Sequence, residues 1–301
     1  MRIPRQTVIA AGTLVAALLG SSSVPLGSSS VPAATSSGAP TSSGAAASEV
    51  AVGVAPEQLS VVGLPCLPGQ LNLTMTNTGA QPRYADMTLE PTGPLQLSRT
   101  LFSSWLPAVD PDQPVSAPVE VRVPRDAQPG SYRIGVEVDR TRVDVPVTVQ
   151  PLPPKGAGDN LALGEQATAS STHGNFTLCG AVDGDKDSEH WDTLTGWNDG
   201  TRAVFPDTYD VALAAPATVN RVELYTLDSA KYPARVNGLR DWDVQVRTGD
   251  TWQTVAQVRG NTVGHVTSTF TPVQTTAVRI LCLDGNDQTY SRIVELEVYG
   301  S

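Results

Sequence analysis

The sequence of 301 residues predicts an all-β protein made of two β-sandwiches in succession. From residue 49 onward, apolar and polar residues alternate with a period of two, which is typical of strands with one buried face. Long segments with the 3.6-residue period of a helix are missing from the same part of the sequence. The 26 glycines and 24 prolines also favour short strands and turns over helices.

The first 48 residues are predicted to be an export sequence and a linker. Arg2 and Arg5 precede an apolar run over 7–20, which is typical of a secretory signal peptide and too short to span a hydrocarbon core of about 30 Å. We place the signal peptide at 1–33, with a second candidate cleavage site after Ala47. Residues 34–48 are rich in Ser, Ala and Gly and predict a flexible linker. We therefore expect a secreted, extracellular protein without a membrane span.

The first sandwich is predicted over 49–150. Alternating runs at 71–75, 119–123, 132–138 and 143–149 predict strands, and the last two are separated by a turn at 139–141. Such short spacing between strands is typical of an antiparallel β-sandwich. Residues 151–158 form a proline-rich junction, which we interpret as a second linker.

The second sandwich is predicted over 159–301. Strand patterns occur at 222–224, 242–246, 278–282 and 294–298. Residues 242–247 and 251–258, joined through Thr248-Gly-Asp250, predict a hairpin.

The negative charge is concentrated in this second region. The whole chain has a net charge of −10 and a pI near 4.7, and residues 159–301, with ten basic and nineteen acidic side chains, account for −9. Such a chain repels nucleic acid and anionic membranes. Twelve of the sixteen aromatic residues and all three histidines also lie in this region, so we expect the functional site there.

The first region resembles the Ig-like modules that accompany bacterial glycoside hydrolases. The resemblance is carried by Leu71-Asn-Leu-Thr-Met-Thr-Asn-Thr-Gly79 and Val121-Arg-Val-Pro-Arg-Asp-Ala-Gln-Pro-Gly-Ser-Tyr132. It implies an Ig-like β-sandwich and says nothing about chemistry.

The second region resembles coagulation factor 5/8 type C (discoidin) domains, which share their jelly-roll fold with family 32 carbohydrate-binding modules. The resemblance is carried, in order along the chain, by Asn160-Leu-Ala-Leu-Gly164, Ala167-Thr-Ala-Ser-Ser171, Ala181-Val-Asp-Gly-Asp185, Trp242-Asp-Val-Gln-Val246 with Trp252, and Glu295-Leu-Glu-Val-Tyr-Gly300. It implies a galactose-binding-like jelly roll and carbohydrate as the leading class of ligand.

An acidic loop within this region is a candidate calcium site. Five carboxylates lie between Gly180 and Asp192 and repel one another unless a cation or solvent screens them. Ca²⁺ prefers such oxygen ligands, but an EF-hand does not fit because Ser188 and Leu194 stand where its glycine and glutamate are needed. The family resemblance instead implies a structural calcium with the ligands Gly180 (carbonyl), Asp183, Asp185, Ser188, Val294 (carbonyl) and Glu295. The alternative is a solvated acidic turn.

The resemblance also implies ligand binding on loops near the metal. A sugar requires an aromatic ring beside hydrogen-bonding side chains. The candidate ligand residues, in loops that also hold His190, Asn198 and Asp199, are Trp197, Arg202, Tyr209, Asp228, Lys231, Tyr232, Arg235 and Asn237. Trp242 and Trp252 alternate with polar residues and are expected in the core, and Trp191 is expected to be structural.

The sequence departs from the galactose-binding pattern of the family. Asn237 matches the asparagine of that pattern, but Asp228 stands at the arginine position, and no histidine lies near Pro206. Galactose specificity therefore does not follow from the resemblance, whereas carbohydrate remains the expected ligand class.

Three cysteines in an exported chain predict one disulfide and one free thiol. Cys282 is in phase with Val278 and Ile280 and should face the core, while Cys179 precedes the acidic loop. Both lie in one predicted domain, so we expect a Cys179–Cys282 disulfide and a free Cys66. A zinc site is the alternative, but no two cysteines have ligand-like spacing.

We expect a non-catalytic, lectin-like protein that binds polysaccharide or glycoconjugate. The pairs Asp241/Asp243 and Asp284/Asp287 lack other marks of a catalytic cleft, and the sequence has no nucleophile elbow, zinc-helix motif or phosphate loop. The alternatives are an adhesion or protein-interaction module of the envelope, an accessory module beside a glycoside hydrolase, and an enzyme without a recognisable motif.

Overall fold

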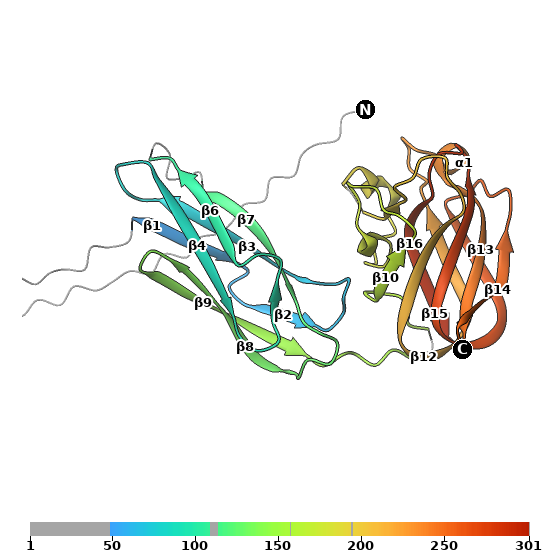
Figure 1. Cartoon of the computed structure of the whole chain (residues 1–301), viewed down its shortest axis with the longest axis horizontal. Helices are drawn as coiled ribbons and strands as arrows, with labels where there is room; N and C mark the ends of the chain where they lie inside the picture. Colours follow the sequence, from blue (N-terminus) through green and yellow to red (C-terminus); the bar gives the residue numbers. More distant parts are fainter. Residues whose placement is uncertain (1–48, 109–113, 157, 194, 301) are drawn as a thin grey trace, which may run out of the picture. The chain divides into compact units, whose positions relative to one another are not determined.

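The computed structural model describes residues 49–108, 114–156, 158–193 and 195–300 (Figure 1). The predicted signal peptide and first linker lie outside these residues. The described chain is nearly all β, as predicted, with one short helix, α1 (Ala234–Asn237), and two 3-10 helices, η1 (Leu178–Ala181) and η2 (Ser188–Thr193). None of these described helices is long and apolar enough to cross a membrane.

Nine strands form two sheets in the described part of the first region. One sheet has the order β1-β3-β7-β5, and the other has the order β2-β9-β8-β4-β6. All neighbouring strands in them are antiparallel except β2 and β9. The strands are β1 (Val50–Ala55), β2 (Leu59–Val62), β3 (Gly69–Asn77), β4 (Arg83–Pro91), β5 (Gln96–Leu97), β6 (Leu101–Leu106), β7 (Val115–Arg122), β8 (Gly130–Val138) and β9 (Thr141–Gln150).

The period-two pattern of these strands produces their shared core. In β3 and β7, every second residue is buried, so Leu71, Leu73, Val119 and Val121 lie in one apolar cluster with residues of β8 and β9. Each such side chain contributes about 1.5–3 kcal/mol when fully buried. The two-sheet sandwich thus follows from the alternation, whereas the Ig-like relationship stays a prediction.

The second region forms one long sheet with the order β11-β16-β12-β15-β13-β14, and β10 pairs with β12 at its side. Its strands are β10 (Gln166–Ala169), β11 (Trp197–Asn198), β12 (Asp207–Thr226), β13 (Leu239–Thr248), β14 (Thr251–Val258), β15 (His265–Gly285) and β16 (Arg292–Gly300). The predicted hairpin is confirmed as β13 and β14, with Gly249 at a positive φ of 61° in its turn.

Two long strands, β12 and β15, give this sheet its jelly-roll form. Their register is interrupted between Ala212 and Ala217, and β12 changes neighbours there. Before the interruption β12 lies between β10 and β15, and after it between β15 and β16. The core contains Trp242 and Cys282, as predicted, whereas Trp252 is only half-buried beneath the Arg279 guanidinium.

The disulfide joins Cys66 to Cys179, so the predicted Cys179–Cys282 pairing is wrong. Cys66 follows β2, and its backbone N–H donates to the carbonyl of Gly164 at 3.0 Å, which holds this loop beside the second sandwich. Gly164 has a φ of +72°, and a Cβ there would meet the Leu67 side chain at 2.8 Å. Cys282 faces the core as predicted, and this burial leaves it a free thiol.

We predict that Cys66→Ser destabilises the protein by up to about 4–5 kcal/mol, because the cross-link closes a long loop in the unfolded chain. Its two cysteines are 113 residues apart. Chemical denaturation of Cys66→Ser and of Cys282→Ala measures the difference. Only the first variant should lose the cross-link, and a bonded Cys282 in the unreduced wild-type protein would contradict the assignment.

Candidate functional site

The acidic loop is shaped by aspartates at every second position. Asp183, Asp185 and Asp187 each accept a hydrogen bond through a side-chain oxygen from the backbone N–H two residues ahead, at 2.9, 3.0 and 2.9 Å. Short polar side chains favour such turns because they bond to nearby backbone. The spacing of these residues therefore has a local structural cause, independent of any metal.

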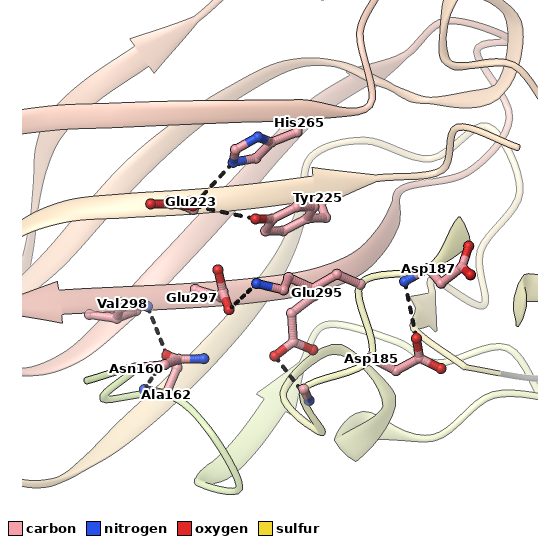
Figure 2. A network of polar contacts seen from close by, with 12 residues as sticks. Asn160, Ala162, Asp185, Asp187, Glu223, Tyr225, His265, Glu295, Glu297 and Val298 are labelled. Carbon is pink, nitrogen blue, oxygen red and sulfur yellow. Dashed lines mark hydrogen bonds and ion pairs between the residues drawn. The ribbon is translucent and has the colours of Figure 1, made fainter. Parts of the chain in front are cut away.

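A buried carboxylate lies beneath this loop. Glu295 of β16 has no exposed surface, and its Oε1 accepts a bond of 3.2 Å from the N–H of Gly184 (Figure 2). Its Oε2 has no hydrogen-bond partner in the described part of the chain. Burial, followed by the charge of Asp183, raises the pKa of Glu295 to about 9. Burial also raises the pKa of Asp183, so this corner of the fold would be stabilised by a positive charge.

The loop is also anchored to the outer face of the sheet. Glu223 and Glu297 face each other in register on β12 and β16, which is unfavourable for like charges. Lys186 of the acidic loop lies 3.1 Å from Glu297, and Arg221 lies 3.3 Å from Glu223. Figure 2 shows Glu223 and Glu297 beside Tyr225, whose ring lies under the Lys186 ammonium.

The other predicted metal ligands already have partners. The carbonyl of Gly180 accepts from the N–H of Gly196, Ser188 Oγ accepts from the N–H of Asp228, and Asp185 Oδ2 lies 2.8 Å from His190 Nδ1. Val294 is buried in an apolar cluster. Within the described ranges, no three Asp, Glu, His or Cys side chains converge as metal ligands. Asp183 and Glu295 are therefore the pair on which a cation site would depend.

A pocket of about 200 Å³ lies among loops of the second sandwich. Segments far apart in the sequence build its wall, including η2, β11, α1 and the start of β16. Aromatic and aliphatic side chains dominate the lining, and three residues add amide or guanidinium groups. The lining residues are Phe176, Trp191, Asn198, Leu227, Tyr232, Asn237, Tyr290 and Arg292.

The apolar wall is held in place by packing. Trp191 is 7% exposed and forms a buried cluster with Leu227 and Val294. The ring of Phe176 lies 4.7 Å from that of Trp191, centroid to centroid, and Tyr232 packs against the same cluster. The aromatic wall is thus fixed before any ligand arrives.

Asn198 and Arg292 differ in how far their polar atoms are already bonded. Asn198 is 6% exposed, and its Nδ2 donates to the carbonyl of Asp199 at 3.2 Å. Its Oδ1 is buried without a partner among the described residues. Arg292 Nη1, by contrast, lies 2.8 Å from both the Asn237 carbonyl and Asp287 Oδ2. The Asn198 oxygen is therefore buried and unpartnered among the described residues, and the charge of the Arg292 guanidinium is compensated.

The loop between β12 and β13 supplies Tyr232 and Asn237, and η2 holds it in position. The Ala230 N–H donates to Glu189 Oε1 at 2.7 Å, and the Asp228 N–H donates to Ser188 Oγ at 3.1 Å. Asp228 Oδ1 in turn accepts from the N–H of Ala234, at the start of α1, at 2.8 Å. These bonds make Glu189 and Asp228 positioning residues for the pocket.

We predict that Glu189→Ala loosens this loop, because the Ala230 N–H loses a charged acceptor. Removing such a bond costs about 1.5 kcal/mol, so hydrogen exchange at the Ala230 amide should accelerate roughly tenfold. Glu189→Gln retains an acceptor oxygen and serves as the control. An equal rate of hydrogen exchange at the Ala230 amide in wild type and in Glu189→Ala would show that the Glu189 bond does not hold the loop.

Two of the eight predicted ligand residues, Tyr232 and Asn237, line the pocket. Trp197 and Tyr209 were wrongly assigned: both are fully buried in the jelly-roll core. The Trp197 indole N–H donates to the Ser171 carbonyl, and the Tyr209 hydroxyl donates to the Leu178 carbonyl. Asp228 instead helps to position the loop, because its side chain accepts the bond from the Ala234 N–H.

The remaining candidates, Arg202, Lys231 and Arg235, are exposed and outside the lining. The Lys231 ammonium lies 4.8 Å from the Tyr232 ring centroid. The arginine of the pocket is instead Arg292, at the start of β16. Phe176, Leu227, Tyr290 and Arg292 were missed because no local pattern links their four segments.

Solved structures similar to this chain include several sugar-binding modules. The chain is 30% identical to chitosan-binding module 1 of a chitosanase/glucanase from Paenibacillus sp. IK-5, over 47% of this chain and 99% of that one, with a TM-score of 0.38. It is 25% identical to the lectin domain of lectinolysin, solved with Lewis B antigen, over 48% and 99%, with a TM-score of 0.41. It is 20% identical to the family 32 carbohydrate-binding module of Streptococcus pneumoniae EndoD, over 48% and 100%, with a TM-score of 0.40. No curated protein matches the chain.

A family model matches the second sandwich. Residues 180–280 match the NedA-like, galactose-binding domain of the F5/8 type C group. This segment runs from η1 into β15 and includes Trp191, Asn198, Tyr232 and Asn237 of the pocket. Residues 180–280, in the second sandwich, are therefore assigned to the F5/8 type C, galactose-binding-like family.

Proposed function

We propose that the second sandwich binds carbohydrate reversibly in the pocket described above. The observation that carries this proposal is a preformed aromatic wall, made by Trp191, Phe176 and Tyr232, in a lining that also includes Asn198 and Asn237. A sugar ring can pack its C–H face on such a wall while its hydroxyls bond to the amides. The galactose-binding family to which the domain belongs supports the same ligand class.

We further propose that binding is the whole function, without bond cleavage. Among the described residues, the pocket lining contains no carboxylate, histidine, cysteine or serine side chain for acid–base or nucleophilic work. Of the carboxylate pairs noted in the sequence, Asp241 and Asp284 both pair with Arg240, and Asp243 pairs with Arg259. Such compensated carboxylates support a structural role.

The wider setting is an exported protein whose first, Ig-like sandwich serves as a spacer. The arginine-flanked apolar run at the N-terminus supports export, and so does the disulfide, because disulfides persist in oxidising compartments. The proposed partners are polysaccharides or glycoconjugates. The protein would bind them by itself or as an accessory module beside a glycoside hydrolase. A protein partner of the envelope is the alternative if folded protein retains no glycan.

We propose a structural calcium ion at Asp183 and Glu295, with ligands added from the acidic loop and the carbonyls of Gly180 and Val294. The unpartnered Oε2 of Glu295 and the raised pKa of both carboxyls support it, since a cation would compensate their buried charge. Asp185 and Ser188 would have to exchange their present partners to join the ligand set.

We predict that Tyr232→Ala and Asn237→Ala each weaken glycan binding at least tenfold, because each removes about 1.4 kcal/mol or more of stacking or hydrogen bonding. A glycan array of the mature protein with calcium identifies the ligand, and titration calorimetry gives the dissociation constants. Arg235→Ala is the matched control from the same loop and should bind like wild type. Unchanged glycan retention in both pocket variants would place the site elsewhere.

We predict that, without calcium, stability falls as pH rises between about 4.5 and 9. Glu295 keeps its proton in the folded protein up to about pH 9 but releases it near its ordinary pKa of 4.5 when unfolded. The unfolded state then binds fewer protons, and the free energy of unfolding drops by at most about 1.4 kcal/mol per pH unit. Calcium binds the ionised carboxylates and should raise the unfolding midpoint most at high pH.

Thermal unfolding at several pH values, with calcium or with a chelator, measures this effect. Glu295→Gln should flatten the pH dependence and remove the response to calcium. A midpoint that calcium leaves unchanged at every pH would refute the metal proposal without affecting the sugar pocket.

A further inference from the structure

We propose that the first sandwich pairs with a second copy of this chain through the open edge of β6, which would join two five-stranded sheets into one. This inference goes beyond the proposed function, because it concerns a surface of the first sandwich. It is carried by the hydrogen-bond pattern of β6, by exposed apolar side chains, and by the register in which two copies fit together.

Strand β6 is an edge strand without the features that protect edges. In the described part of the chain it pairs with β4 alone, and its six pairs, from Arg83↔Leu106 to Thr88↔Leu101, run without a bulge. Its sequence, Leu101-Phe-Ser-Ser-Trp-Leu106, has no charged residue and no proline. Charges, prolines and bulges keep edge strands of natural proteins from pairing with other chains, so β6 is open to a further strand.

The backbone of β6 directs every second residue to this open edge. The N–H of Leu89 donates to the carbonyl of Thr100 at 2.9 Å, and from there hydrogen-bonded pairs of β4 and β6 alternate with non-hydrogen-bonded pairs. Leu101, Ser103 and Trp105 belong to the non-hydrogen-bonded pairs. Their N–H and C=O groups therefore point away from β4, toward the edge.

Three exposed apolar side chains lie on this strand and its neighbour. Tyr84 is 72% exposed, Leu101 55% and Trp105 48%. The rings of Tyr84 and Trp105 lie opposite each other on β4 and β6, with centroids 4.8 Å apart and an interplanar angle of 62°. Rings inclined in this way do not form a flat surface for a sugar chain, but an aliphatic side chain can pack against them.

An antiparallel pairing of β6 with its own copy suits both the backbone and the side chains. When Ser103 lies opposite its own equivalent, Leu101 of each copy lies opposite Trp105 of the other. All three residues direct their backbone to the edge, so each row can form a hydrogen-bonded pair. Each exposed leucine then packs against an indole, and cross-strand pairs of this kind stabilise a sheet.

The pairing is closed by symmetry. Its twofold axis passes beside Ser103, so the edge of each β6 is used up and association ends at the dimer. The Trp105 carbonyl also accepts from Ser104 Oγ at 3.4 Å, but a carbonyl oxygen has a second lone pair for the new bond.

Charge does not oppose this pairing. Asp86 of β4 lies opposite Ser103, and the two copies of Asp86 would be about 14 Å apart, which is three strand spacings and exceeds the screening length of about 8 Å at physiological salt. Residues 1–158 carry a net charge of only −1, whereas residues 159–301 carry −9. An uncharged edge fits an uncharged strand, and β6 is itself such a strand.

The contact is small, so we expect a reversible dimer. β6 contributes six residues, compared with about 20–30 residues a side in a stable interface. The monomer and the dimer should therefore be in an equilibrium that depends on the protein concentration.

Sedimentation equilibrium of the mature protein over a range of concentrations tests the proposal. Wild type should fit a monomer–dimer equilibrium. Ser103→Lys puts two like charges opposite each other at the axis and should weaken association by about fivefold or more. Ser131→Lys makes the same change at an exposed position of β8, inside the same sheet, and should associate like wild type.

A mixture of two variants tests the register itself. Ser103→Asp alone should also associate more weakly than wild type. Mixed in equal amounts with Ser103→Lys, it should recover dimers, because opposite charges then meet at the axis. Thermal unfolding of each variant confirms that the first sandwich is folded.

Three results would overturn the proposal: a wild type that stays monomeric up to about 1 mM, undiminished association of Ser103→Lys, or a mixture of folded variants that recovers no dimers. A monomeric wild type whose Leu101 and Trp105 amide resonances shift on titration with an extended apolar peptide would have a foreign strand as its partner, which also excludes self-pairing. None of these results bears on the sugar pocket, which the glycan array tests by itself.

Discussion

The burial of Trp191 against Leu227 and Val294 is the contact on which the site depends. Trp191 lies in η2, which follows directly on the acidic loop, and Val294 precedes Glu295 in β16. The same indole forms part of the pocket wall. One packing contact therefore connects the carboxylate pair, the loop above it and the aromatic wall that we propose binds a sugar. A displaced Trp191 would open the pocket and release the loop together.

The acidic loop illustrates how one sequence feature can have two physical causes. Its alternating aspartates bond to the backbone two residues ahead, which gives the loop its shape. Glu189, also in this series, reaches across to the N–H of Ala230 and holds the pocket loop. Asp183 and Glu295 both have raised pKa values, and the charge of Asp183 contributes to that of Glu295. The count of carboxylates is thus a poor guide to the number of metal ligands.

Much of the fold could be predicted from the sequence, because period-two alternation reports directly which face of a strand is buried. That Tyr232 and Asn237 line a pocket agrees with a similar argument, since a polar loop between two strands tends to lie at the surface; their role in binding stays a prediction. Trp197 was misjudged because its strand, β11, has only two residues and shows no alternation. Arg292 and Phe176 were missed because only the pairing of distant strands brings them together. The disulfide partner of Cys179 was predicted wrongly for the same reason. Cys66 reaches it because the Cys66 loop approaches Gly164, which the spacing of the cysteines along the chain does not reveal.

We propose that a sugar enters the pocket walled by Trp191. The chain has five tryptophans, so its indole N–H resonances form a small set that can be assigned by substitution. Titration of the mature, isotope-labelled protein with a glycan that it binds follows all five at once. We expect the Trp191 resonance to shift with saturation while that of Trp105, exposed on the first sandwich, stays fixed. A saturable shift confined to Trp105 or Trp252 would contradict it.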